Sequence, residues 1–361
     1  MTHHHTQRLN DAVLDEARAF ATLKQEWDEL YADSPLATPF QSWAWLYSWW
    51  EIYGENYDLR LITIRAGGLL VGILPMMLER RWGLFGRLMF IGKDSSDYLD
   101  LLARGGWEER VAEVGVDALW QINSGRVIDL RQLRPEAAAW GIFRRWPGPR
   151  SYLRQAGCPV IEVRPEDELL ASVSKNLRST ARRAIRRAEE DNVHRRLADA
   201  EDAEQAVGRL LQLHLEMRRG RDIAPEHSTE RFESFLAAAV RRLTACDLGG
   251  ISEFRRDGEV VASHFLVFGR GFVGEHLWGA KQAAARRYQV SSLNVWDAVS
   301  IARSRGSTRV DLLRGEEPYK LRWASDIIIN HRAVLGKSAV FGRLFLACLL
   351  LYSKIRGYAS A

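Results

Sequence analysis

The sequence predicts a mixed α/β or α+β fold in two compact units, and three features carry this prediction. The chain has 361 residues, whereas one domain usually has about 100–200. Strand-like and helix-like stretches alternate along the first half. A stretch rich in proline and glycine, residues 144–157, then divides the chain. We therefore expect one unit over residues 1–155 and a second over residues 156–361.

The first half opens with a helical pattern over residues 11–32. An aromatic helix follows, in which Trp43, Leu46, Tyr47 and Trp50 recur at helical spacing, as core residues do. Residues 59–65 and 69–78 flank Gly67-Gly68, which predicts a β-hairpin. The remaining elements expected here are a strand, a helix and a strand, at residues 97–102, 107–120 and 126–130.

The second half begins with a strand at residues 158–163 and a basic helix at residues 174–190, for which Ser174 is the expected N-cap. Two more helices follow, at residues 201–218 and 229–243. Three strands joined by tight-turn sequences come next, at residues 250–258, 259–269 and 272–280. A loop at residues 281–290 then leads to a helix at 291–305 and a strand at 308–313. A polar segment at 314–323, a strand at 326–336 and a terminal helix at 338–356 follow.

Composition excludes several classes of protein. Charged residues make up 27% of the chain and aromatic residues 10%, which argues against disorder. Three distant cysteines exclude a disulfide scaffold. Residues 1–30 lack the apolar core of a secretory leader, and no apolar stretch is long enough to span a bilayer. We therefore expect a cytoplasmic protein, at most peripheral on the inner face of the membrane.

Positive charge is concentrated in one region of the chain. Residues 144–196 contain thirteen Lys or Arg and seven Asp or Glu, an excess of six, while the whole chain carries +5. Such a region suits a polyanionic partner, namely cofactor phosphates, lipid headgroups or RNA. The alternative is a solvated basic helix that binds nothing.

The stretch 281–323 has the clearest family features. A helix that ends in glycine leads to a strand bearing an aspartate, and then to a GxxxYK-type loop before an aromatic residue. These positions are Gly306, Asp311, Gly315, Tyr319, Lys320 and Trp323. With the preceding helix pair and antiparallel strands, and the opening FQSWAWLYSWWEIYG (40–54), the chain resembles the cellulose-biosynthesis (CelD-like) family of GNAT-type acetyltransferases over roughly residues 36–325.

This resemblance implies two tandem GNAT-like halves, each a mixed, mainly antiparallel sheet flanked by helices. It also implies a relation to the Fem-type peptidoglycan aminoacyltransferases. The second half, 156–361, is then the GNAT domain that binds acyl-CoA as co-substrate. We expect no metal.

The resemblance also implies where the acyl-CoA phosphates bind. The implied contacts are Arg286, Arg287, Gln289, Val290, Ser291 and Ser292. A GNAT phosphate loop usually contains glycines, and residues 287–292 contain none. The free N–H groups at the start of the following helix suit a pyrophosphate regardless, and we expect Ser291 or Ser292 to cap that helix.

Acyl transfer to an amine requires a group that removes a proton from the amine, because an alkylammonium with a pKa near ~10.4 is protonated at neutral pH. His264, Glu275 and His276 are candidates for this base. Since side chains alternate along a strand, at most one of Glu275 and His276 faces the reacting groups. Lys320, beside Tyr319, is a candidate for holding a phosphate or stabilising a developing oxyanion. The alternative is a surface loop lysine.

Three residues are candidates for contact with the acceptor substrate. His264 lies in an apolar strand, where a core histidine satisfied by a neighbour is the favoured interpretation. Asp311 is expected to orient the loop after its strand. Glu316 either holds the acceptor amine or is solvated.

Together these observations predict an acyl-CoA-dependent N-acyltransferase acting on an amine of an envelope polysaccharide, sugar or lipid precursor, with nucleic acid not among its expected partners. One alternative is a Fem-type transferase that uses aminoacyl-tRNA. Another is a non-catalytic GNAT scaffold in polysaccharide synthesis. The terminal helix at residues 338–356 is expected either to contact a membrane or to clasp the two halves together.

Overall fold

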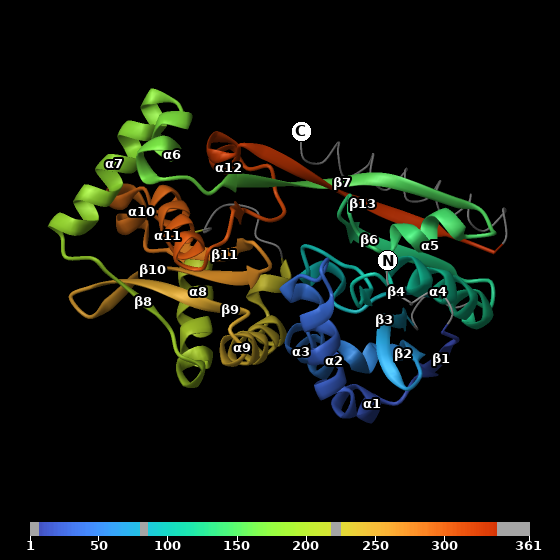
Figure 1. Ribbon diagram of the computed structural model, residues 1–361. Coiled ribbons are helices and arrows are strands. Elements are labelled where there is room, and N and C mark those ends of the chain that lie inside the picture. Colours follow the sequence, from blue (N-terminus) through green and yellow to red (C-terminus); the bar gives the residue numbers. More distant parts are fainter. Residues whose placement is uncertain (1–6, 80–85, 218–224, 338–361) are drawn as a thin grey trace. The chain divides into compact units, whose positions relative to one another are not determined.

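The computed structural model describes residues 7–79, 86–217 and 225–337 (Figure 1). They divide into two compact units. Unit 1 contains the described residues up to Gln155 and those from Ile329 onward, and unit 2 contains Ala156–Ile328. The described residues 329–337 thus lie in unit 1, whereas the sequence analysis expected them in the second half.

Unit 1 is built on a mixed sheet that is mostly antiparallel. Its strands are β1 (Leu9–Leu14), β2 (Tyr57–Ala66), β3 (Leu69–Glu79), β4 (Arg87–Phe90), β6 (Val127–Leu133) and β13 (Asp326–Leu335), in that spatial order. Among the described strands of this sheet, β4 and β6 form the parallel pair. The short β5 (Leu102–Ala103) pairs with β3.

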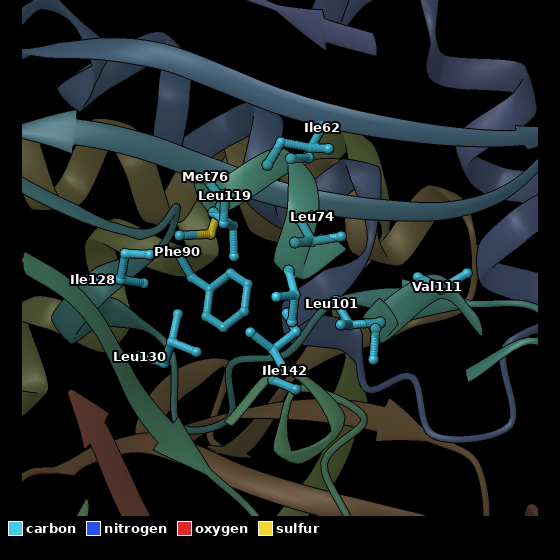
Figure 2. Packing of buried hydrophobic residues seen from close by; sticks show 14 of the residues in the cluster. Ile62, Leu74, Met76, Phe90, Leu101, Val111, Leu119, Ile128, Leu130 and Ile142 are labelled. Atoms are coloured by element: carbon cyan, nitrogen blue, oxygen red, sulfur yellow. The ribbon is translucent and has the colours of Figure 1, made fainter. Parts of the chain in front are cut away.

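Five α-helices accompany this sheet: α1 (Ala17–Thr22), α2 (Lys24–Asp33), α3 (Trp43–Tyr53), α4 (Glu108–Ile122) and α5 (Trp140–Arg145). Helix α4 connects the parallel strands. Its Leu119 packs with Leu74, Phe90 and Ile142 in the core of the unit (Figure 2). The aromatic stripe of α3 is largely core as expected, with Trp43 and Leu46 buried, while Tyr47 and Trp50 are half-buried.

Unit 2 repeats this order of strands. Its sheet contains β8 (His194–Leu197), β9 (Gly249–Arg256), β10 (Glu259–Gly269), β11 (Phe272–Ala280), β12 (Arg309–Asp311) and the end of β7 (Arg150–Glu162). Again one of the described pairs is parallel, β11 with β12, and two helices connect these strands. The same succession in both units confirms the predicted mixed, mainly antiparallel sheets flanked by helices.

The last strand of each sheet spans a boundary between the two units in the sequence. Strand β7 follows unit 1 in sequence, yet its Val160–Glu162 pair with β12 of unit 2. Strand β13 follows unit 2, yet its His331–Leu335 pair with β6 of unit 1. Strand β7 therefore begins at Arg150, inside the proline- and glycine-rich stretch, and it includes most of the strand expected at residues 158–163.

The helices of unit 2 are α6 (Glu166–Ser172), α7 (Lys175–Glu190), α8 (Ala203–Met217), α9 (Glu230–Ala245), α10 (Gln282–Tyr288), α11 (Val290–Ser304) and α12 (Pro318–Trp323). Helices α8 and α9 lie on one side of β9–β11, and α10 and α11 on the other (Figure 1). Helix α7 begins as predicted, because Ser174 Oγ accepts from the Leu177 N–H and caps it.

Four expected elements differ in the structure. Residues 11–32 are not one helix, because Leu9–Leu14 pair with the edge of β2 before α1 and α2 begin. Of the expected strand 97–102, only Leu102 is in a strand. The expected loop 281–290 contains α10, and the polar segment 314–323 contains α12.

The terminal helix expected at residues 338–356 lies outside the described residues. Among the helices that the structure does describe, none is long and apolar enough to cross a membrane.

Candidate functional site

The parallel strands at the centre of unit 2 separate partway along their length. Strand β12 pairs with β11 only from Phe272↔Arg309 to Gly274↔Asp311. Beyond Gly274, β11 continues to Ala280, while the Leu312 N–H donates to Pro159 O on the other side. The two strands therefore diverge at Glu275, the first residue after the last pair.

A β-bulge lies at the same point. Leu266 pairs with Glu275 and Phe265 with Leu277, so His276 is the extra residue on β11. Glu275 contacts His264, whereas the His276 ring packs edge-on against Phe265, with centroids 5.5 Å apart. Since His264 and Phe265 are consecutive on β10, Glu275 and His276 face opposite sides of the sheet. Glu275 faces α11.

A buried polar network connects β9, β10, β11 and α11 on that side. His264 Nε2 lies 2.9 Å from Asp297 Oδ2, and His264 Nδ1 lies 3.3 Å from Glu275 Oε1. Ser252 Oγ donates to Asp297 Oδ2 over 2.7 Å, and Arg195 Nε lies 3.5 Å from Asp297 Oδ1. His264 is 0% exposed. It is a core histidine, as the sequence favoured, and two carboxylates satisfy it.

Burial opposes a positive charge on His264, because the charged ring loses its hydration. The hydrogen bonds with Asp297 and Glu275, together with their negative charges, outweigh burial and raise the pKa of His264 to about 9. The imidazole is therefore protonated at neutral pH.

Glu275 has one oxygen that the network does not use. Its residue is 4% exposed, and among the described residues its Oε2 has no hydrogen-bond partner. Leaving a buried polar atom unpaired costs about 1–3 kcal/mol, so such atoms commonly bind water or a ligand. Glu275 Oε2 is therefore suited to receive a polar group of a substrate.

The loop after β12 is fixed by its own side chains. Asp311 is buried, and its Oδ1 accepts from the N–H of Leu313, which has a φ of 54°. Lys320 Nζ donates to Arg314 O over 2.7 Å and lies 3.2 Å from Glu317 Oε2. Lys320 is therefore buried within its loop and is not a surface lysine.

Two other candidate residues have direct contacts in this region. Glu316 is exposed, and its Oε1 accepts a hydrogen bond from the N–H of Gly157, which lies within β7. Tyr319 OH accepts from Trp278 Nε1 over 3.0 Å. Since Trp278 lies on β11 beyond the divergence and Tyr319 lies on α12, this hydrogen bond connects the two sides of the separated strands.

The residues expected to bind the cofactor lie at the junction of α10 and α11. Gln289 joins the two helices with φ 47° and ψ 57°, and α11 begins at Val290. Ser291 and Ser292 lie within the first turn and neither caps it, which corrects the expected cap. Arg287 is paired with Asp191 through two nitrogens, and this ion pair holds the pKa of Asp191 well below its usual range. Arg286 is exposed.

The starts of the two corresponding helices differ in charge. The first turn of α11 contains no acidic residue, so its free N–H groups and the helix dipole both favour an anion. The first turn of α4 in unit 1 contains Glu108 and Glu109, which oppose an anion. The start of α11 is therefore more favourable for an anion than the start of α4.

Asp297 and Ser252 are not among the residues predicted from the sequence. The sequence does contain a signal for Asp297. It is a charged residue four positions from both Leu293 and Ile301, on a face of α11 that is buried. Nothing local distinguishes Ser252. Within the described ranges, no group of three or more His, Cys, Asp or Glu side chains is placed to hold a metal ion.

Comparison with known protein families finds a match for the larger part of unit 2. Residues 175–321, from the start of α7 into α12, match the acetyltransferase (GNAT) domain family. The chain thus carries a GNAT-type acyltransferase domain, and its enzyme class is that of an acyltransferase. The CelD-like resemblance is not reproduced by this match. No curated protein sequence matches the chain.

Solved structures share the fold at low sequence identity. FemX superposes with a TM-score of 0.64 at 12% identity, covering 86% of this chain and 95% of FemX. The C-terminal domain of a putative lysylphosphatidylglycerol synthetase from Agrobacterium fabrum gives 0.59 at 10% identity, covering 92% and 97%. L-PGS from Bacillus licheniformis gives 0.59 at 10%, covering 92% and 96%. These similarities establish the fold alone.

Proposed function

We propose that this protein is an acyl-CoA-dependent N-acyltransferase that acylates an amine of an envelope polysaccharide, sugar or lipid precursor. The observation that carries the proposal is the position of Glu275. It directly follows the last β11–β12 pair and has a buried carboxylate oxygen that no described residue hydrogen-bonds. The family match to a GNAT domain supports the reaction class.

The start of α11 supports acyl-CoA as the donor. Its N–H groups have no acidic neighbour in the first turn, and Arg286 lies in the last turn of α10, close by in sequence. A pyrophosphate fits such a helix start without a glycine-rich loop, because backbone N–H groups supply the contacts. Acyl-CoA would supply the thioester that is transferred.

Glu275 and Tyr319 then have separate roles in proton transfer. Glu275 Oε2 accepts the proton that the acceptor ammonium must lose before it attacks. Tyr319 OH, oriented by the indole N–H of Trp278, donates its proton to the thiolate that leaves. Lys320 and Asp311 hold the loop that carries Tyr319, and they contribute to the site through that loop.

The test combines donor binding with turnover. Saturating acetyl-, butyryl- or palmitoyl-CoA should raise the melting temperature by about 5–10 °C at 100-fold over Kd. Thiol release should then depend on an added amine, tested with glucosamine, ethanolamine lipids and amino sugar nucleotides. Glu275→Gln should reduce kcat by about 100-fold or more and leave the Kd of the acyl-CoA unchanged. A parent protein that binds none of the three donors contradicts the proposal.

The basic face of α7 favours a second candidate, a transferase that takes its acyl group from aminoacyl-tRNA. Lys175, Arg178, Arg182 and Arg186 recur along one side of this helix, while its apolar residues are buried. This candidate predicts that the purified protein retains RNA and binds tRNA with a steep salt dependence. Binding of acyl-CoA without tRNA binding would exclude it.

A further inference from the structure

His264 lies between two carboxylates at the centre of the buried network of unit 2. Each ring nitrogen is within hydrogen-bond reach of a carboxylate oxygen, Nε2 of Asp297 and Nδ1 of Glu275. An ionised carboxylate only accepts hydrogen bonds. Both nitrogens must therefore donate, which requires an imidazolium.

The surrounding charges balance only with a protonated ring. The groups that face it are the carboxylates of Glu275 on β11 and Asp297 on α11, and Arg195 on β8 reaches the far oxygen of Asp297. Two negative charges thus meet two positive charges. Ser252 on β9 adds a neutral hydrogen bond to Asp297. Phe254 packs against the ring, with centroids 5.9 Å apart, and restricts its rotation.

We propose that His264, anchored by Asp297, is a positioning residue that fixes the Glu275 carboxylate so that Oε2 receives the ammonium group of the acceptor. The bond from Nδ1 engages Oε1 and leaves Oε2 as the unpartnered oxygen. His264 itself is fully buried and touches neither substrate. It acts only through Glu275, and this role rests on the proposed function, in which Glu275 removes the proton of the amine.

Two substitutions separate this role from a purely structural one. The amide nitrogen of Asn is attached to Cγ, as Nδ1 is, so His264→Asn keeps a donor toward Glu275 and loses the one toward Asp297. The amide nitrogen of Gln is attached one carbon further, as Nε2 is, so His264→Gln keeps the donor toward Asp297 and loses the one toward Glu275. Both variants lose the ring and its positive charge, and they are therefore matched controls for each other.

The experiment measures kcat and KM for amine acylation by acetyl-CoA in the parent and both variants. His264→Asn should retain at least about tenfold more kcat than His264→Gln, a difference of about 1.4 kcal/mol, with KM for acetyl-CoA unchanged in both. Equal kcat values, or a more active His264→Gln, overturn the inference while an active parent preserves the proposed function. A parent without transfer activity overturns the proposed function and this inference with it.

A measurement on the parent keeps the proposal falsifiable if either variant fails to fold. In ¹⁵N NMR of histidine-labelled protein, both ring nitrogens of His264 should be protonated at pH 7.5. Addition of ethylamine should shift the carboxyl ¹³C signal of Glu275 and leave the His264 nitrogens protonated. A neutral His264 ring at pH 7.5 overturns the inference whatever the activity.

Discussion

Gly279 on β11 lies directly against the backbone of His214 on α8. An ideal Cβ built on Gly279 would lie 2.3 Å from His214 N and 2.6 Å from Leu213 C. The contact is reinforced by His214 Nδ1, which donates to Trp278 O over 2.7 Å. Helix α8 can therefore approach the sheet this closely only because position 279 has no side chain.

Gly279→Ala should destabilise unit 2 by about 1–3 kcal/mol, because two backbones must move apart. The measurement is the free energy of unfolding in urea. Gly208→Ala, on the same helix α8, is the matched control. A Cβ there meets only Glu233 Oε1 at 3.4 Å, so the better helix propensity of alanine should stabilise by about 0.5–1 kcal/mol. Equal effects of the two substitutions would contradict this account of α8 packing.

Much of unit 2 could be predicted because its signals are local. Ser174 precedes a helical pattern and caps α7, and turn residues such as Asp257-Gly258 separate β9 from β10. Alternation along β11 correctly predicted that Glu275 and His276 face opposite sides. Each of these features is determined by residues within a few positions of one another.

Features that depend on distant residues were not predicted. Leu9–Leu14 form a strand only because the edge of β2, some fifty residues later, offers hydrogen bonds. The pairing of β7 with β12 and of β13 with β6 joins strands that are far apart in the sequence, so no neighbouring residue predicts it. Likewise the partners of His264 come from β11 and α11, so the sequence identified the residue but not its network.

Lys320→Met should lower stability, because the ammonium holds the Arg314 carbonyl and Glu317 together inside the loop. We expect a loss of about 1–2 kcal/mol, since Glu317 is half-exposed and can rehydrate. The melting temperature should fall by about 2–8 °C. Lys281→Met is the control, because Lys281 pairs with Glu259 at the surface and should matter little. If Lys320→Met melts with the parent but loses activity, Lys320 acts on the substrate instead.

His264 makes stability depend on pH in the alkaline range. Its folded pKa of about 9 exceeds the unfolded value of about 6.5. Between these values the folded state retains a proton that the unfolded state releases. The stabilisation is therefore complete below about pH 6.5 and is lost as the pH rises through 9, by about 3 kcal/mol in all. Urea unfolding of the parent at pH 6, 7.5 and 9.5 should show this decline. His264→Gln has no titrating side chain at this position, so its stability should not show this loss of about 3 kcal/mol. If stability falls with pH equally in the two proteins, His264 is not the group responsible.

The start of α11 should lose its affinity for a phosphorylated donor when an acid is placed in its first turn. Ser291 is the second residue of α11, and Ser291→Glu would give this helix the charge that Glu108 and Glu109 give to α4. A glutamate there interacts favourably with the helix dipole, so the fold should be as stable as the parent or slightly more so. The same charge repels the pyrophosphate, and we expect the Kd of acetyl-CoA to rise at least about tenfold, or about 1.4 kcal/mol.

Ser300→Glu adds an equal charge at an exposed position in the second half of α11 and should leave the Kd close to that of the parent. Calorimetric titration of the three proteins with acetyl-CoA decides the matter, because equal weakening by both glutamates would mean that net charge, and not the start of α11, governs donor binding.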